Sequence, residues 1–338
     1  MRLLTLGDLR AMDSPLDAAG LDLEFQAMAR ARHAGNPGEL AALGVRLITG
    51  HDAPRAPTDG LALLNEAAAQ GSAHAWHLLA VLAAAGAARK QDWGDAFAAL
   101  EKAAALGHKP ARRERQILSS LGITSESTAA HWIARAGNPR VLHPAPRFAA
   151  HAGLLPLALC KYLIELATPR LRRAQVFDAA TGTLKTDPMR TNQAAAFSIV
   201  DSTVVMQLMR ARIAQAAGVE FAMLEPLEVL HYQGGELYRP HIDFFHPSRR
   251  NYESEMRLRG QRVKTCLVYL NGNYEGGETD FPKLGIRFRG EVGEGLVFDS
   301  VDATGQGDMN TLHAGLPPMS GIKWLLSQWI REKAQPVA

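Results

Sequence analysis

The chain has few cysteines, little net charge and no long apolar run. Its 338 residues include only Cys160 and Cys266, which excludes a disulfide-framework protein and is consistent with a reducing compartment. The formal net charge of +3 points to neither a nucleic-acid nor a membrane partner. The run AWHLLAVLAAAGAA is too short to span a bilayer, and the N-terminus, with Asp8, lacks the apolar core of a signal peptide. We therefore expect a cytoplasmic protein.

The chain has enough apolar residues to form sizeable cores, since 47% of its residues are hydrophobic and 21% are charged. Its length favours two domains. Its first 125 residues are rich in Ala and Leu, which predicts helices. Glycines recur there in two series with a spacing of 36 residues, namely Gly35, Gly71 and Gly107, and Gly50, Gly86 and Gly122. A fixed period of this size predicts stacked helix pairs. A helical bundle with chance glycine spacing is the alternative.

The unit LLNEAAAQGSAHAWHLLAVLAAAG resembles the Sel1-like relatives of the tetratricopeptide repeats. Three such units would cover about residues 22–125. We therefore expect an α-helical Sel1-like repeat region over residues 1–135 and a second domain over residues 136–338. The resemblance implies a concave surface able to hold a protein substrate, or else a structural brace.

The second half has a different texture. LALCKYLIELA and STVVMQLMRARIAQAAG predict helices, and from Leu227 onward the chain breaks into short runs that predict strands. These runs are LEVLHY, RVKTCLVYL, IRFRGEV, GLVFDS and IKWLLSQWI. Five such strands, separated by Gly, Asn, Pro and Asp, predict a β-sandwich or jelly roll with supporting helices.

His241 and Asp243, in YRPHIDFFHP, are the first candidates for chemistry. Residues two apart in a strand point to the same face, so an imidazole and a carboxylate would converge there. Together they form two-thirds of the facial triad that binds non-haem iron(II). By itself the pair is a weak signal.

The third ligand could be His231, His246 or His313. His231 alternates differently along its strand, and strand geometry directs His246 out of line. His313 precedes a Pro-Pro-Met-Ser-Gly turn, after which a new strand starts at Ile322. We therefore expect His313 and Lys323 to be neighbours in a hairpin.

Lys323 is the anomaly of its strand, because apolar residues surround it on both faces. A buried lysine is costly unless it meets an anion. The distal carboxylate of a 2-oxo diacid that chelates the metal would serve. A hydrolytic zinc site would leave Lys323 unexplained.

Residues 138–333 resemble a prolyl 4-hydroxylase domain of the iron(II)- and 2-oxoglutarate-dependent dioxygenases. The resemblance runs through RTN, LEVLHYQGGELYRPHIDFF, RVKTCLVYLNGNYEGGETDFP and DMNTLHAGLPPMSGIKWLLSQWIRE. It implies a double-stranded β-helix, which is a jelly roll. It also implies hydroxylation of a C–H bond, most simply in a prolyl residue, with release of succinate and CO2. The cofactors implied are Fe(II), 2-oxoglutarate, O2 and the reductant L-ascorbate.

The same resemblance assigns roles by position. His241, Asp243 and His313 would bind iron, and Lys323 would pair with the distal carboxylate of 2-oxoglutarate; these four would be the catalytic set. Thr265 would hydrogen-bond that same carboxylate, and Tyr232 and Tyr269 would line the cosubstrate site. Tyr238 and Arg190 would face the substrate.

Two other functions stay open. The same chemistry could act on a small metabolite, a free amino acid or a nucleobase. The chain could instead be a non-catalytic repeat scaffold with a ligand-binding oxygenase fold, although the complete triad and Lys323 argue against it.

The basic segment 246–264 is either a solvated loop or a lid over an extended peptide. We expect a protein or peptide partner, no nucleic acid and no membrane.

Overall fold

The structure is a computed structural model that describes residues 36–51, 53–178, 183–246 and 252–335. These residues fall into two compact units. Among the described residues, the first comprises residues 36–131 together with Ser198–Leu208, and the second comprises Trp132–Phe197 and residues 209–335. The predicted domain boundary after residue 135 stays a prediction. No helix among the described residues has both the length and the apolar character needed to cross a membrane.

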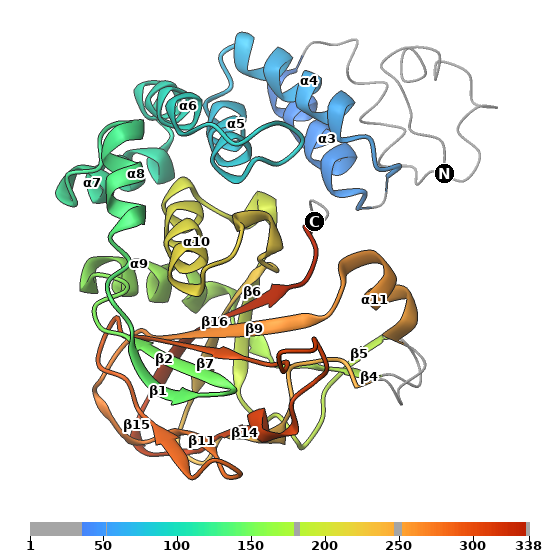
Figure 1. Cartoon of the computed structure of the whole chain (residues 1–338). Coiled ribbons are helices and arrows are strands. Elements are labelled where there is room, and N and C mark those ends of the chain that lie inside the picture. The colour runs from blue at the N-terminus through green and yellow to red at the C-terminus, as the bar shows by residue number, and fades with distance from the viewer. Residues whose placement is uncertain (1–35, 52, 179–182, 247–251, 336–338) are drawn as a thin grey trace. The chain divides into compact units, whose positions relative to one another are not determined.

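The first unit is built from consecutive helices (Figure 1). The helices of the N-terminal part are α3 (Pro37–Thr49), α4 (Pro57–Ala69), α5 (Ala73–Ala85), α6 (Trp93–Ala105), α7 (Lys109–Ser120) and α8 (Glu126–Ala134). Helices α3, α5 and α7 start 36 residues apart, as do α4 and α6. The sequence period is therefore a period of helix pairs over the described residues. The Sel1-like type stays a prediction, and its portion over 22–35 lies outside the described residues.

Side-chain caps repeat with the same period. Asn36, Ser72 and His108 precede α3, α5 and α7, and each side chain accepts a hydrogen bond from a backbone N–H of the first turn. Asn and Ser are favoured at this position because their short oxygens reach those amides. Histidine at the third cap is the exception in the series.

Glycine sets the spacing of the first helix pair. A Cβ built on Gly60 would lie 2.5 Å from the carbonyl oxygen of Gly44, and a Cβ on Gly44 would lie 2.8 Å from that of Gly60. Real Cβ atoms do not approach backbone oxygens so closely. The two glycines therefore allow α3 and α4 to pack backbone to backbone.

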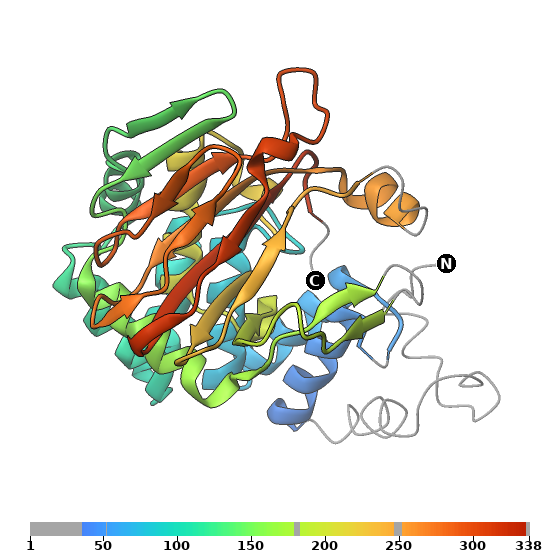
Figure 2. The same cartoon turned by 90° about the horizontal axis from the view of Figure 1, so that it is seen from below.

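The second unit contains two facing antiparallel sheets (Figure 2). The larger has, in spatial order, β1 (Arg140–Pro144), β2 (Arg147–His151), β13 (Gly295–Asp299), β9 (Arg262–Tyr269), β16 (Lys323–Arg331), β7 (Leu227–Tyr232), β6 (Gln193–Phe197) and β3 (Arg172–Arg173). The smaller has β12 (Ile286–Phe288), β11 (Thr279–Phe281), β14 (His313–Gly315) and β8 (Tyr238–His241). Two ribbons, β10 (Tyr274–Gly276) with β15 (Pro318–Gly321) and β4 (Val176–Asp178) with β5 (Thr183–Lys185), complete the strands of the described residues.

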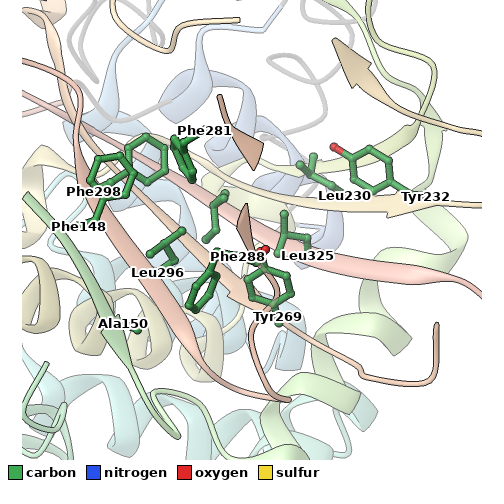
Figure 3. Close-up of a cluster of buried hydrophobic side chains, with 11 residues drawn as sticks. Phe148, Ala150, Leu230, Tyr232, Tyr269, Phe281, Phe288, Leu296, Phe298 and Leu325 are labelled. Carbon is green, nitrogen blue, oxygen red and sulfur yellow. The ribbon is translucent and has the colours of Figure 1, made fainter. Parts of the chain in front are cut away.

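The core lies between the two sheets (Figure 3). Alternate residues of the larger sheet point into it, because side chains in a strand alternate between faces. Phe281 and Phe288 enter from the smaller sheet. The ring of Phe281 meets those of Phe148 and Phe298 edge-on, with centroids 4.6 and 5.1 Å away. The predicted jelly roll is confirmed.

Helices α9 (Leu157–Ala167) and α11 (Glu253–Arg259) belong to the second unit with these strands, whereas α10 (Val204–Ala217) starts in the first unit and ends in the second. α9 coincides with the predicted LALCKYLIELA, and α10 lies within the second predicted helix. α11 falls in the basic segment 246–264, where Glu255 accepts a hydrogen bond from Arg331 at 2.6 Å. Residues 247–251 of that segment lie outside the described residues, and the lid interpretation stays a prediction.

The predicted hairpin of His313 and Lys323 is wrong. β14 pairs with β8 and β11 in the smaller sheet, β15 pairs with β10, and β16 lies between β9 and β7 in the larger sheet. The turn residues thus form a strand of their own. This extra strand carries the chain from one sheet to the other.

Candidate metal centre

Three ligand-type side chains meet where β8 and β14 pair. His313 stands opposite His241 in the register of the two strands. Asp243 follows in the bend after β8, so the bend and not strand alternation alone turns its carboxylate inward. One ligand atom from each residue lies within 4.8 Å of the others. The smaller sheet therefore brings together the three residues singled out in the sequence.

Hydrogen bonds orient the two imidazoles. His241 Nδ1 lies 2.9 Å from the carbonyl oxygen of Arg239, and His313 Nδ1 lies 2.9 Å from that of Thr311. A carbonyl can only accept, so Nδ1 carries the proton in each ring and Nε2 keeps its lone pair. The Nε2 atoms lie 3.8 and 3.7 Å from the oxygens of Asp243. Such outer contacts are the usual way in which proteins fix a metal-binding tautomer.

The electrostatics favour a neutral His241 beside an ionised Asp243. Burial, together with neighbouring His313, lowers the pKa of His241 to about 3. Burial by itself would raise the pKa of Asp243, but His313, His241 and the hydroxyl of Thr265 outweigh burial. The pKa of Asp243 therefore lies below its usual value. Neutral imidazole and carboxylate are the protonation states that bind a metal.

Lys323 lines the same pocket from the larger sheet. It is fully buried, and within the described part of the chain its Nζ has no hydrogen-bond partner. The amine lies 5.2 and 5.5 Å from the ring centroids of Tyr232 and Tyr269. Burial lowers its pKa to about 7, partly offset by Glu278. A buried amine without a partner, in a pocket beside a ligand triad, is suited to an incoming anion.

Tyr238 and Arg190 form a stack on the metal-facing histidine. The ring of Tyr238 lies nearly parallel to that of His241, with centroids 3.5 Å apart. The guanidinium of Arg190 lies 5.0 Å from the centroid of Tyr238. Glu228 accepts a hydrogen bond from Arg190 at 3.1 Å. Both residues line the pocket, as the predicted substrate contacts would. Tyr232 lines it too, and Gly315 leaves room beside its hydroxyl.

Thr265 and Tyr269 have hydrogen-bond partners within the protein, and their predicted roles at the cosubstrate stay predictions. Thr265 donates to Oδ2 of Asp243 at 2.6 Å. The hydroxyl of Thr265 thus orients Asp243.

Tyr269 is a fully buried core residue. Its hydroxyl pairs with Thr279 at 2.8 Å and donates to the carbonyl of Phe288 at 3.0 Å. Thr279 lines the pocket in its place. The ring of Tyr269 nevertheless contributes one wall of the space around Lys323.

Sequence reasoning missed several pocket residues on β16. Leu325, Ser327 and Trp329 share the face of Lys323 and line the pocket with it. Their period of two was a usable signal once Lys323 had been chosen. The rejected candidates point elsewhere: His231 packs against Trp324, with ring centroids 4.5 Å apart, and His246 is exposed.

Two imidazoles and one carboxylate on one side of a pocket are the donor set preferred by iron(II) with open positions. The unpartnered Lys323 amine adds a seat for an anion in the same space. The residues present therefore fit both an iron ion and a carboxylate cosubstrate.

Comparison with known proteins agrees with this geometry. Residues 227–331 match the family model of the 2OG-Fe(II) oxygenase superfamily. Prolyl 4-hydroxylase 1 of Arabidopsis thaliana is 32% identical over 218 residues, which cover 60% of this chain and 75% of that protein. The chain belongs to the prolyl 4-hydroxylase family. It is thus a 2-oxoglutarate-dependent dioxygenase that uses Fe(II) and O2.

Two further relatives match over about half of this chain. Human prolyl 4-hydroxylase subunit alpha-1 is 32% identical over 190 residues, or 56% of this chain and 35% of that subunit. The chain thus spans about a third of the animal subunits. A viral collagen prolyl hydroxylase from Paramecium Bursaria Chlorella virus-1, solved with 2OG, shares 25% identity over 54% of this chain and 94% of its own, with a TM-score of 0.41.

Proposed function

We propose that the chain hydroxylates a prolyl residue of a peptide or protein, with 2-oxoglutarate as cosubstrate. The observation that carries the proposal is the shared pocket, in which the triad on β8 and β14 faces an unpartnered buried lysine on β16. Its relatives are prolyl 4-hydroxylases, which supports a prolyl substrate. A hydrolytic metal site has no use for that lysine.

In this proposal His241, Asp243 and His313 hold iron(II), and Lys323 pairs with the distal carboxylate of 2-oxoglutarate. Iron(II) held there, together with dioxygen and 2-oxoglutarate, would supply the oxidising power for hydroxylation of a C–H bond, with succinate and CO2 as the co-products. L-ascorbate would serve as the reductant that keeps the iron divalent.

The chain's own residues position the reactants. The carbonyls of Arg239 and Thr311 hold Nε2 of each histidine toward the metal, and Thr265 holds Asp243. Tyr232 lies beside the cosubstrate. Tyr238, which contacts both Arg190 and His241, would face the substrate. The apolar sheet face around them excludes water.

We further propose that the helical repeats recruit the protein substrate and that the enzyme acts in the cytoplasm. Stacked helix pairs offer extended binding surfaces, which supports recruitment. Cys160 and Cys266 are both buried free thiols, which supports a reducing compartment.

The test is to incubate the full chain with Fe(II), 2-oxoglutarate, ascorbate and prolyl peptides, and to measure succinate together with a 16-dalton gain on proline. His313→Ala should abolish both signals, since it removes a metal ligand. The matched control is His246→Ala, an exposed histidine near Asp243 that should keep full activity. Turnover supported better by zinc than by iron would refute the proposal. A mass gain on a small metabolite or nucleobase, and none on any peptide, would refute the prolyl substrate.

A further inference from the structure

Three histidines outside the oxygenase pocket converge in the helical repeats. His74 and His77 are three residues apart in α5, so they share one helix face. His108 is the residue that precedes α7. One ring nitrogen from each of the three lies within 4.8 Å of the others. Two consecutive repeats thus contribute imidazoles to one point.

A buried carboxylate stands behind this cluster. Glu114 of α7 is fully buried, and its Oε1 lies 2.5 Å from Nε2 of His77. Its Oε2 accepts the backbone N–H of Val205 at 3.2 Å. Because the carboxylate accepts, His77 carries its proton on Nε2 and keeps the lone pair of Nδ1 free. A carboxylate behind an imidazole is the arrangement that orients histidine ligands in zinc sites.

We propose that His74, His77 and His108 form a second metal site, which binds Zn2+ or a similar divalent transition ion through three imidazoles. Glu114 positions His77 without touching the metal. The site lies within the repeats and is independent of the proposed hydroxylase function.

The ring geometry fits such an ion. With metal–nitrogen bonds of about 2.0–2.1 Å, the ring centroids of two tetrahedral histidine ligands lie about 5 Å apart. The observed centroid separations are 4.6 Å for His77 with His108 and 5.7 Å for His74 with His108. Small side-chain rotations would complete the coordination. His74 is exposed, so a metal can enter and water can take the fourth position.

His108 occupies a capping position at which an ordinary helix cap would suffice. The equivalent positions of the two preceding repeats hold Asn36 and Ser72, ordinary helix caps. His108 also caps its helix, but its Nδ1 lies 3.3 Å from the N–H of Ala111, a long contact that a metal can displace. The rival explanation is that the three rings only pack together and cap α7.

Cobalt(II) binding by the full chain separates these explanations. The variant His241→Ala/His313→Ala, which lacks the first triad, should still bind one equivalent with a tetrahedral absorption spectrum. Adding His74→Gln should weaken cobalt binding by more than about a hundredfold, because one of the three ligands is lost. Since His74 is exposed, this change should leave the core undisturbed. Adding His108→Asn should do the same while keeping a favoured cap. The matched control His131→Gln, an exposed histidine of α8, should change nothing.

Glu114→Gln tests the positioning role. The glutamine oxygen would still accept the N–H of Val205, so its amide would donate to Nε2 of His77 and force the proton onto Nδ1. Cobalt affinity should fall by about 10- to 100-fold, the effect typical of outer contacts. The proposal is overturned if the triad-free variant binds no cobalt, or if His74→Gln leaves its affinity unchanged.

Discussion

At the scale of single residues, the oxygenase site depends on groups whose protonation or pairing is fixed by one neighbour each. Carbonyl oxygens fix the tautomers of His241 and His313, and one hydroxyl fixes Asp243. Lys323 is the opposite case, a buried cation left without a partner among the described residues. His241, His313 and Asp243 are therefore arranged to bind a cation, and Lys323 to bind an anion.

Lys323→Ala should raise the Michaelis constant for 2-oxoglutarate strongly. Removing one partner of a buried charge pair costs about 2–5 kcal/mol, or roughly 30- to 4,000-fold. The measurement is succinate formation against 2-oxoglutarate concentration. Lys264→Ala, which removes the partner of Asp299 on the same sheet, is the control and should leave the constant unchanged. An equal rise in both variants would point to general damage to the sheet.

The affinity for 2-oxoglutarate should fall as pH rises above about 7. Burial lowers the pKa of Lys323 to about 7, Glu278 opposes this, and the facing phenols of Tyr232 and Tyr269 stay neutral because burial raises their pKa values. Below pH 7 the ammonium is already charged, whereas above it binding must first add a proton. The dissociation constant should therefore rise by up to about tenfold per pH unit.

Calorimetric titrations between pH 6 and pH 9 would measure this dependence. Lys323→Arg, which stays charged throughout, should bind 2-oxoglutarate with little change over the same range. A flat profile in the unmodified protein would contradict a titrating Lys323.

At the scale of elements, close packing in the repeats rests on glycine. Gly60→Ala should destabilise the protein by about 1–3 kcal/mol, because the new methyl group would overlap the backbone of α3 and push the pair apart. Chemical denaturation would measure the change. Gly94→Ala in the first turn of α6, where the nearest atoms are carboxylate oxygens 3.3 and 3.6 Å away, should be neutral or slightly stabilising. Equal losses at both sites would exclude the packing explanation.

At the same scale, β16 shows how one strand serves both core and site. Its inward face carries Lys323, Leu325 and Ser327 into the pocket at a period of two. The neighbouring strands β7 and β9 satisfy its backbone on both sides. The backbone of Lys323 is therefore fixed within the sheet.

At the scale of the whole molecule, the two predicted domains should divide binding from chemistry. A fragment of residues 136–338 should still bind iron and 2-oxoglutarate, because every proposed ligand lies beyond residue 230. Hydroxylation of a protein target should fall through weaker binding, while a short prolyl peptide should react equally with fragment and full chain. Kinetics with both substrates would measure this. If the fragment aggregates or loses peptide turnover as well, the repeats are a structural brace and the recruiting role fails.

The sequence by itself determined the local structure and the chemical class. Helix pairs repeat at 36 residues, α9 spans its predicted bounds, and His241, Asp243 and His313 meet as expected. The helices and strands follow from periods of 3.6, 2 and 36 residues, which are visible in the order of side chains. The convergence of the three ligands also needed the pairing of β8 with β14. Lys323 could be chosen because a lone charge in an apolar strand is visible without a structure.

Only the tertiary structure decided what depends on register between distant strands and helices. It showed that Thr265 donates to Asp243, and it placed β14 and β16 in different sheets. It also brought His108 to His74 and His77 across a repeat. In each case the partners are far apart in sequence, and their contact is set by how whole elements pack rather than by any local period.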